Sequence, residues 1–246
     1  MRAATFDEQP GHEIFSDAER SAWHALFERH FGVADGRKAL DLASGTGVIS
    51  HLMHDLGFAV TGMDWSEAML EKARAKSRLR GSNIRFLLGD AEQTLEEDDS
   101  YDVIVTRHLV WTLVDPAAAF AEWFRVLKPG GKLLVVDGDF VSPTWATKLN
   151  KAMSGFLETI GLRKPTEPVA HMQTHRDILA RVHFSEGARA NDVSAMLART
   201  GFDPVIVDFD LRQIHAAQKK HISFAKGLER GVQHRYAICA QKPIAG

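Results

Sequence analysis

The stretch "ALDLASGTGVIS" at residues 39–50 places a carboxylate just before a loop of small residues. Gly45 and Gly47 in this loop let the backbone approach a ligand closely, and the apolar, helix-like run after it favours an anion at its N-terminus. Asp41 stands against that preference, because its negative charge would repel a pyrophosphate. The bound molecule must therefore tolerate a carboxylate at this point and use it.

Two more carboxylates follow short apolar runs in the same way. Asp64 comes directly after "FAVTGM" and is placed to accept hydrogen bonds from ribose hydroxyls. Asp90 lies in "GDAE", where it either accepts a hydrogen bond from an adenine amino group or forms a turn after Gly89. The loops that follow parallel strands meet in one crevice, so we expect these side chains around one nucleoside.

The glycine loop departs from the fingerprint of dinucleotide-binding proteins. That fingerprint is G-x-G-x-x-G, whereas residues 45–50 read GTGVIS, so Ser50 replaces the third glycine. S-adenosylmethionine has no phosphate but carries an ammonium group and a sulfonium, so Asp41 can orient its cationic end while backbone amides line the rest. A dinucleotide-dependent oxidoreductase is the weaker alternative, because it explains neither Asp41 nor Ser50.

Short β-like runs alternate with amphipathic helical segments from Lys38 onward, which predicts parallel βαβ units. Strands are expected at residues 38–43, 58–63, 83–88, 101–106, 132–138, 204–211 and 236–242. Helices are expected at residues 17–31, 48–57, 66–81, 116–127, 192–202 and within 213–231. Ser66 can cap one helix, and Asn191 or Asp192 another. Gly57 and Gly81 can end theirs in the left-handed conformation.

Four motifs in order resemble the class I S-adenosylmethionine-dependent methyltransferases of small molecules. They are "DLASGTGVIS", "GMDWSEAML", "GDAEQ" and "FRVLKPGGKLLVVDGD", and the resemblance covers about residues 38–139. It implies a doubly wound α/β, Rossmann-like fold with a mostly parallel seven-stranded sheet and an antiparallel C-terminal strand. Ala43 departs from the pattern, since the family usually has the first glycine of its loop there.

The same resemblance implies roles for individual residues. The methionine part of the cofactor would lie on Asp41, Ala43, Ser44, Gly45 and Gly47, and the ribose on Asp64. The adenine would lie near Trp65 and Met69, with Asp90 and Ala91 at its edge, and Arg107 would lie under the methionine and face the substrate. Judged without the neighbouring Asp64, both Trp65 and Met69 would be interpreted as core residues.

The acceptor side is less clearly marked. His108 and Trp111 in "RHLVWTL" either pack inward or form a substrate wall. Methyl transfer from a sulfonium releases a neutral leaving group, so the protein mainly positions the nucleophile and excludes water. A general base is needed only for an acceptor that must lose a proton, and His108 is the candidate, followed by His171, His175 and His183. Product formation would release S-adenosylhomocysteine.

Asp137 and Asp139 end the fifth predicted strand and could bind a divalent cation through oxygen atoms. No third carboxylate is evident beside them, so we predict no metal site.

Several acceptors are excluded by the residues after the fourth strand and by the cysteine count. The strand ends in "TRHL" rather than the Asn/Asp-Pro-Pro-aromatic segment that holds a flipped base in enzymes that methylate amino groups of nucleic acids. The single cysteine, Cys239, lies in the last predicted strand, which argues against methylation of pyrimidine C5 or arsenite. A small molecule with an oxygen, nitrogen or carbon nucleophile remains. A non-catalytic module that binds S-adenosylmethionine is the alternative.

Length and charge complete the prediction. The 246 residues suggest one domain, with residues 1–37 as a helical cover and residues 140–191 as a cap. We expect the cap and the N-terminal helix together to carry acceptor specificity. The net charge of −2 provides no basic field for nucleic acid. No run approaches the roughly 20 apolar residues that span a bilayer, and the N-terminus has no apolar signal segment. We therefore expect a cytoplasmic protein with a small-molecule partner and no membrane contact.

Overall fold

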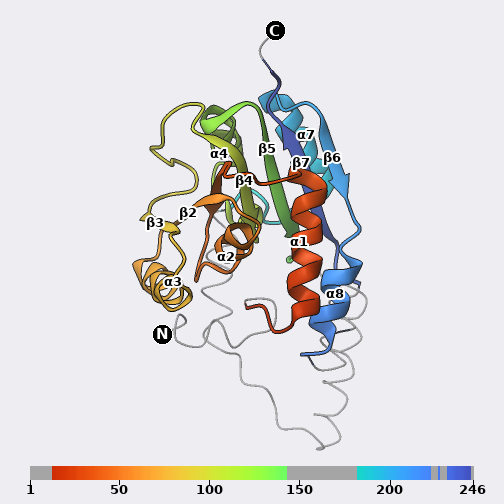
Figure 1. The fold of residues 1–246 in the computed structure, drawn as a ribbon. Helices are drawn as coiled ribbons and strands as arrows, with labels where there is room; N and C mark the ends of the chain where they lie inside the picture. Colours follow the sequence, from red (N-terminus) through yellow and green to blue (C-terminus); the bar gives the residue numbers. More distant parts are fainter. Residues whose placement is uncertain (1–12, 143–181, 223–226, 228–231, 245–246) are drawn as a thin grey trace, which may run out of the picture.

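A seven-stranded sheet forms the centre of the computed structural model, which describes residues 13–142, 182–222, 227 and 232–244 (Figure 1). Its strands are β1 Lys38–Leu42, β2 Ala59–Asp64, β3 Arg85–Leu88, β4 Tyr101–Arg107, β5 Leu127–Gly138, β6 Val205–Asp208 and β7 Arg235–Gln241. Their order is β3-β2-β1-β4-β5-β7-β6, and β7 runs antiparallel to both of its neighbours. The predicted fold class is confirmed.

Helices cover both faces of this sheet. They are α1 Asp17–Phe31, α2 Val48–Asp55, α3 Glu67–Arg80, α4 Pro116–Val126, α7 Ala190–Thr200 and α8 Arg212–Lys219, with a short 3₁₀ helix, η2, at Val110–Thr112. In Figure 1, α1 and α8 lie side by side on the near face, and α4 and α7 lie behind the sheet. The helix predicted at residues 17–31 coincides with α1.

Two local predictions were wrong, and a third was right in position only. The backbone of Arg189 is extended and takes the N-cap position of α7, so this helix begins before Asn191 and Asp192. Ser66 is at the N-cap of α3 but makes no side-chain cap bond; its N–H instead donates to Asp64. Strand β5 begins at Leu127 rather than at residue 132, because Leu127 already pairs with β4 before the register shifts.

Other predictions lie partly outside the described residues. Of the cap proposed at residues 140–191, residues 143–181 are not described, and they include His171 and His175. Ala190 and Asn191 belong to α7 rather than to a cap. His183 is described: its N–H donates to the carbonyl of Leu113, and its ring packs on Phe184.

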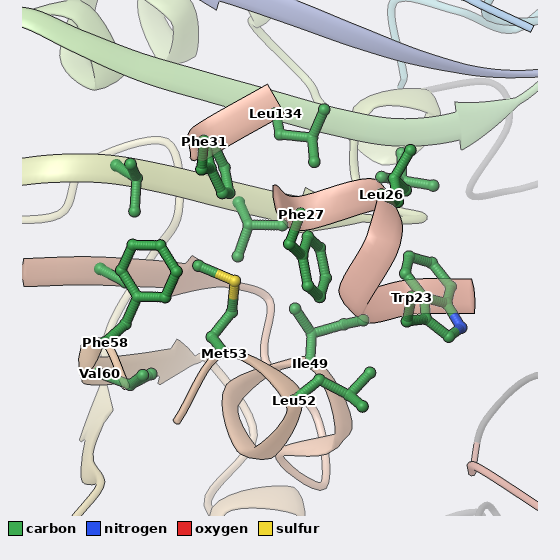
Figure 2. Close-up of a cluster of buried hydrophobic side chains, with 14 of the residues drawn as sticks. Trp23, Leu26, Phe27, Phe31, Ile49, Leu52, Met53, Phe58, Val60 and Leu134 are labelled. Carbon is green, nitrogen blue, oxygen red and sulfur yellow. The ribbon is translucent and has the colours of Figure 1, made fainter. Parts of the chain in front are cut away.

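Alternation along the strands divides the apolar residues between two cores. One core joins the sheet to α1, α2, α3 and α8, and Figure 2 shows Phe27, Leu52 and Met53 at its centre beneath the strands. The other joins the sheet to α4 and α7, with Phe120 and Trp123 completely buried. The two cores hold the strands in one register, and this register aligns their carboxyl ends.

The strand register brings the ends of β1, β2, β4 and β5 to one edge. Leu42 pairs with Met63 on one side and with Thr106 on the other, and Arg107 pairs with Val136. The loops that follow these strands therefore lie next to one another, as expected for an open parallel sheet. In the described part of the chain, every helix is too short or too polar to cross a bilayer.

The packing of α1 on the sheet can be tested at Phe27. Its side chain is completely buried, and its ring stacks 6.3 Å from that of Phe31. We expect Phe27→Ala to lower the free energy of unfolding by about 3–5 kcal/mol, because it removes apolar contacts and leaves a cavity. Urea denaturation measures this. Val33→Ala is the control, since Val33 is 83% exposed; an equal loss in both variants would contradict the packing described.

Candidate functional site

A cavity of about 790 Å³ lies at the carboxyl edge of the sheet. Ten residues predicted from the sequence line it: Asp41, Ala43, Ser44, Gly45, Asp64, Trp65, Met69, Arg107, His108 and Trp111. Six others were not predicted: Thr46, Val48, Ile49, Ser66, Phe140 and Arg235. The cavity has an acidic end beside the glycine loop and an aromatic end beside η2.

The glycine loop turns tightly between β1 and α2. Ala43, Gly45 and Gly47 all have positive φ values, of 55°, 56° and 81°. A side chain in this region costs roughly 1–2 kcal/mol, so the loop forms with an alanine at its first position at some expense in stability. The N–H of Ser44 donates to the carbonyl of Met63 over 2.9 Å, which anchors the loop to the neighbouring strand.

Asp41 is a buried carboxylate, only 2% exposed, in the middle of the sheet. Burial raises its pKa to about 7, while a hydrogen bond from Ser50 and the charge of Arg107 act in the opposite direction. The Ser50 hydroxyl donates to Oδ2 of Asp41 over 2.5 Å. Ser50 occupies the position of the missing third glycine, so that replacement is explained by the carboxylate it holds.

Asp64 connects two loops at the acidic end. Its Oδ2 accepts the N–H of Gly45 over 2.8 Å, and its Oδ1 accepts the N–H of Ser66 over 2.9 Å. The carboxylate is 7% exposed and lines the cavity. Trp65 beside it is 86% exposed and also lines the cavity, so it is not a core residue.

The aromatic end is built around Phe140. Its ring lies 4.9 Å from that of His108 and 6.1 Å from that of Trp111, and the guanidinium carbon of Arg235 lies 5.3 Å above it. His108 has a positive φ of 59°, at the turn where β4 ends. These four side chains meet at the ring of Phe140, and all of them line the cavity as its aromatic wall.

Asp137 fixes the segment that carries Trp111. Its carboxylate is buried and accepts the N–H groups of Val110 and Gly138, each over 2.8 Å. Burial raises the pKa of Asp137 to about 7, against the effect of these hydrogen bonds. Asp139 likewise binds backbone, accepting the N–H groups of Val141 and Ser142. Among the described residues, no group of three or more His, Cys, Asp or Glu side chains could hold a metal.

Three predicted cofactor residues do not line the cavity. Oδ1 of Asp90 accepts the N–H of Glu92 over 2.9 Å, so this residue forms the turn that was the alternative interpretation. The carbonyl of Ala91 accepts the indole N–H of Trp123. Gly47 is the N-cap residue of α2 and so contributes to the turn of the glycine loop without lining the cavity.

The chain matches the family model described as "Methyltransferase domain" over residues 40–135. The demethylmenaquinone methyltransferase of Renibacterium salmoninarum is 31% identical over 186 residues, which cover 72% of this chain and 76% of that protein. This chain belongs to the class I S-adenosylmethionine-dependent methyltransferases. The ubiquinone/menaquinone biosynthesis C-methyltransferase of Shewanella oneidensis is 36% identical over 136 residues, 51% of this chain and 54% of that protein.

Solved structures confirm the fold of this methyltransferase. Phosphoethanolamine N-methyltransferase 2 of Haemonchus contortus, with S-adenosylhomocysteine bound, superimposes with a TM-score of 0.66 at 17% identity, covering 98% of this chain and 57% of that one. Geranyl diphosphate C-methyltransferase of Streptomyces coelicolor gives 0.60 at 16% identity, covering 90% and 80%. The methyltransferase uses S-adenosylmethionine and acts on a small molecule, as its sequence predicts.

Gly47 is the loop position of the methyltransferase that tolerates a side chain least. A Cβ atom there would lie 3.0 Å from Cζ of Phe86 and 3.2 Å from Cβ of Ala73. We expect Gly47→Ala to cost about 1–3 kcal/mol of unfolding free energy more than Gly81→Ala, because only Gly47 adds overpacking to the strain of positive φ. A Cβ atom on Gly81 would have no neighbour within 4 Å. Urea denaturation of both variants measures the difference, and equal costs would contradict it.

Proposed function

We propose that this methyltransferase transfers the methyl group of S-adenosylmethionine to a ring carbon of a planar hydroxyaromatic acceptor of the reduced-quinone class. The observation that carries the proposal is the continuous cavity that joins the acidic glycine loop to the aromatic wall. The names of the relatives support the acceptor class, since one is a demethylmenaquinone methyltransferase and the other a ubiquinone/menaquinone biosynthesis C-methyltransferase. A volume of about 790 Å³ leaves room for a second ligand beside the cofactor.

The residues at the acidic end fit the cofactor. Asp41 would hold the cationic end of the methionine part, and Asp64, which is already fixed by two N–H donors, would accept from the ribose hydroxyls. Trp65 would cover the adenine, because its ring is exposed at the cavity. Asp90 and Ala91 do not line the cavity, and their place at the edge of the adenine stays a prediction. When bound, the cofactor supplies a methyl group on a sulfonium.

The aromatic end fits a flat acceptor. Phe140 and Trp111 can stack on a ring, and aromatic pairs contribute about 0.5–1.5 kcal/mol beyond the area they bury. His108 contacts Phe140 and lines the same cavity, so it is the candidate that removes the ring proton after the new carbon–carbon bond forms. Positioning of the ring carbon near the methyl group would contribute more than this base, roughly 7–11 kcal/mol.

Other predictions about the protein stay predictions. They are the absence of a nucleic-acid partner, a cytoplasmic location and a single domain with a specificity cap.

Turnover with a simple acceptor tests the proposed function. The protein, S-adenosylmethionine with a deuterated methyl group and 1,4-dihydroxynaphthalene under reducing conditions should yield S-adenosylhomocysteine and a product labelled on carbon. Mass spectrometry measures both. His108→Ala should lower kcat by about 10²–10⁴-fold if it removes the ring proton. Tight binding of S-adenosylhomocysteine without methylation of hydroxyaromatic compounds would contradict the proposed acceptor class.

The charge of Asp41 predicts a pH dependence of cofactor binding. Below its pKa of about 7 the carboxyl is neutral, and above it the carboxylate attracts the ammonium group of the cofactor. Affinity for S-adenosylhomocysteine should therefore rise as the pH increases from about 5.5 to about 8.5, with Arg107, Asp64 and Ser50 facing the same carboxylate. Calorimetry measures this. Asp41→Asn should bind S-adenosylhomocysteine more weakly, and its affinity should no longer rise with pH. The same rise in the variant would show that a different group causes the pH dependence.

A further inference from the structure

A small side pocket continues the cavity beyond its aromatic end. Its volume is about 20 Å³, and Arg107, His108 and Arg235 line both spaces. Roughly 10–15 Å³ is enough to hold one water oxygen, so the side pocket accommodates a single polar group. A substituent on a ring held at Phe140 would enter it beside Arg107 and Arg235, which line both spaces.

The strand order fixes these two guanidinium groups. Arg107 ends β4 and Arg235 begins β7, and both pair with the end of β5, at Val136 and Gly138. The guanidinium carbon of Arg107 lies 5.6 Å above the ring of Trp23, and Arg235 is oriented by two hydrogen bonds to Oε1 of Gln233. A guanidinium that lies over a ring presents its N–H groups at its edge, where they can meet a carboxylate or phenolate oxygen.

Trp23 adds a third donor. It lines the side pocket, is only 3% exposed, and its Nε1 is buried with no hydrogen-bond partner in the described part of the chain. An indole N–H can only donate, so its missing partner is an acceptor. In Figure 2 this nitrogen lies on the side of the ring away from Phe27 and Ile49. The rest of the ring belongs to the apolar core.

Two carboxylates near the pocket are already engaged. Asp137 lines it, but its oxygens accept the N–H groups of Val110 and Gly138. Asp41 lies on the cofactor side and accepts from Ser50. Neither supplies the acceptor that Trp23 lacks.

We propose that Arg235, Arg107 and the indole N–H of Trp23 form a subsite for an anionic oxygen of the acceptor. The planar acceptor then binds with an ionised hydroxyl or a carboxylate directed between the two guanidinium groups. This inference rests on the proposed function, which supplies the planar ring of the acceptor. It adds the requirement that the acceptor carry a negatively charged oxygen. An ionised hydroxyl in this place would also enrich the adjacent ring carbon in electrons, and that carbon forms the bond to the methyl group as the carbon–sulfur bond breaks.

Matched probes test the subsite in protein saturated with S-adenosylhomocysteine. One pair is 2-hydroxy-1,4-naphthoquinone, ionised at about pH 8, and its neutral methyl ether; the other is 2-naphthoate and 2-naphthamide. Calorimetry should show at least one ionised member binding about tenfold or more tighter than its neutral partner, as expected for charge-assisted hydrogen bonds. The pair that shows the preference identifies the oxygen as a ring oxygen or a carboxylate.

Three variants test which residues cause the preference for the ionised probes. Arg235→Gln should reduce it to about threefold or less, and Trp23→Phe, which keeps a ring but removes the N–H, should weaken only the ionised probe. Arg212→Gln removes an equally charged side chain that is 87% exposed, and should behave as the unmodified protein. Affinity for S-adenosylhomocysteine should stay within about threefold in all three variants, because none alters a residue assigned to the cofactor.

Two results would overturn the subsite: no preference for either ionised probe, or a preference that survives both Arg235→Gln and Trp23→Phe. Either result leaves the proposed function intact as long as S-adenosylhomocysteine binds. Failure of S-adenosylhomocysteine to bind the unmodified protein would reject the proposed function itself.

Discussion

The buried carboxylate of Asp41 constrains the whole acidic end of the cavity. It lies on β1, between β2 and β4, is almost completely buried, and has a pKa that burial raises to about 7. Ser50 must reach it from α2, which fixes the rotation of that helix. Gly62 on β2 makes room, because a Cβ there would lie 2.9 Å from the Ser50 hydroxyl. The residues of β1, α2 and β2 at this point thus fit together around the carboxylate of Asp41.

Features that depend on neighbours in sequence could be predicted. The strands, α1 and the residues Asp41 and Asp64 follow from apolar periodicity and from their positions next to a glycine loop or a strand end. The start of α7 and the early start of β5 could not, because they depend on backbone pairing: Arg189 is extended, and Leu127 pairs with Tyr101. Asp90 was ambiguous in the sequence, and the hydrogen bond from Glu92 explains its turn.

His108 and Trp111 at the acceptor end were predicted from their place after the fourth strand, and both line the cavity. Three other residues of that end were missed for a different reason. Phe140, Arg235 and Trp23 come from a loop, from an antiparallel strand and from α1, which are far apart in the chain. They meet only because β7 inserts between β5 and β6 and α1 packs on the sheet. No local motif marks such residues. Trp23 and Phe140 do come from the two segments in which acceptor specificity was predicted, although most of residues 140–191 lies outside the described structure.

The cavity therefore carries carboxylates at one end and guanidinium groups at the other. This difference in charge determines which ligand binds at which end. Asp41 and Asp64 attract a cationic cofactor to the glycine loop, while Arg107 and Arg235 disfavour a cation at the aromatic end. Arg107 belongs to both ends, since its charge acts on Asp41 and its guanidinium lies over Trp23. A cation bound at Asp41 would offset the charge of that carboxylate and so weaken its attraction for Arg107, which favours an anion beside the guanidinium. Cofactor and anionic acceptor should consequently favour each other's binding through this one side chain.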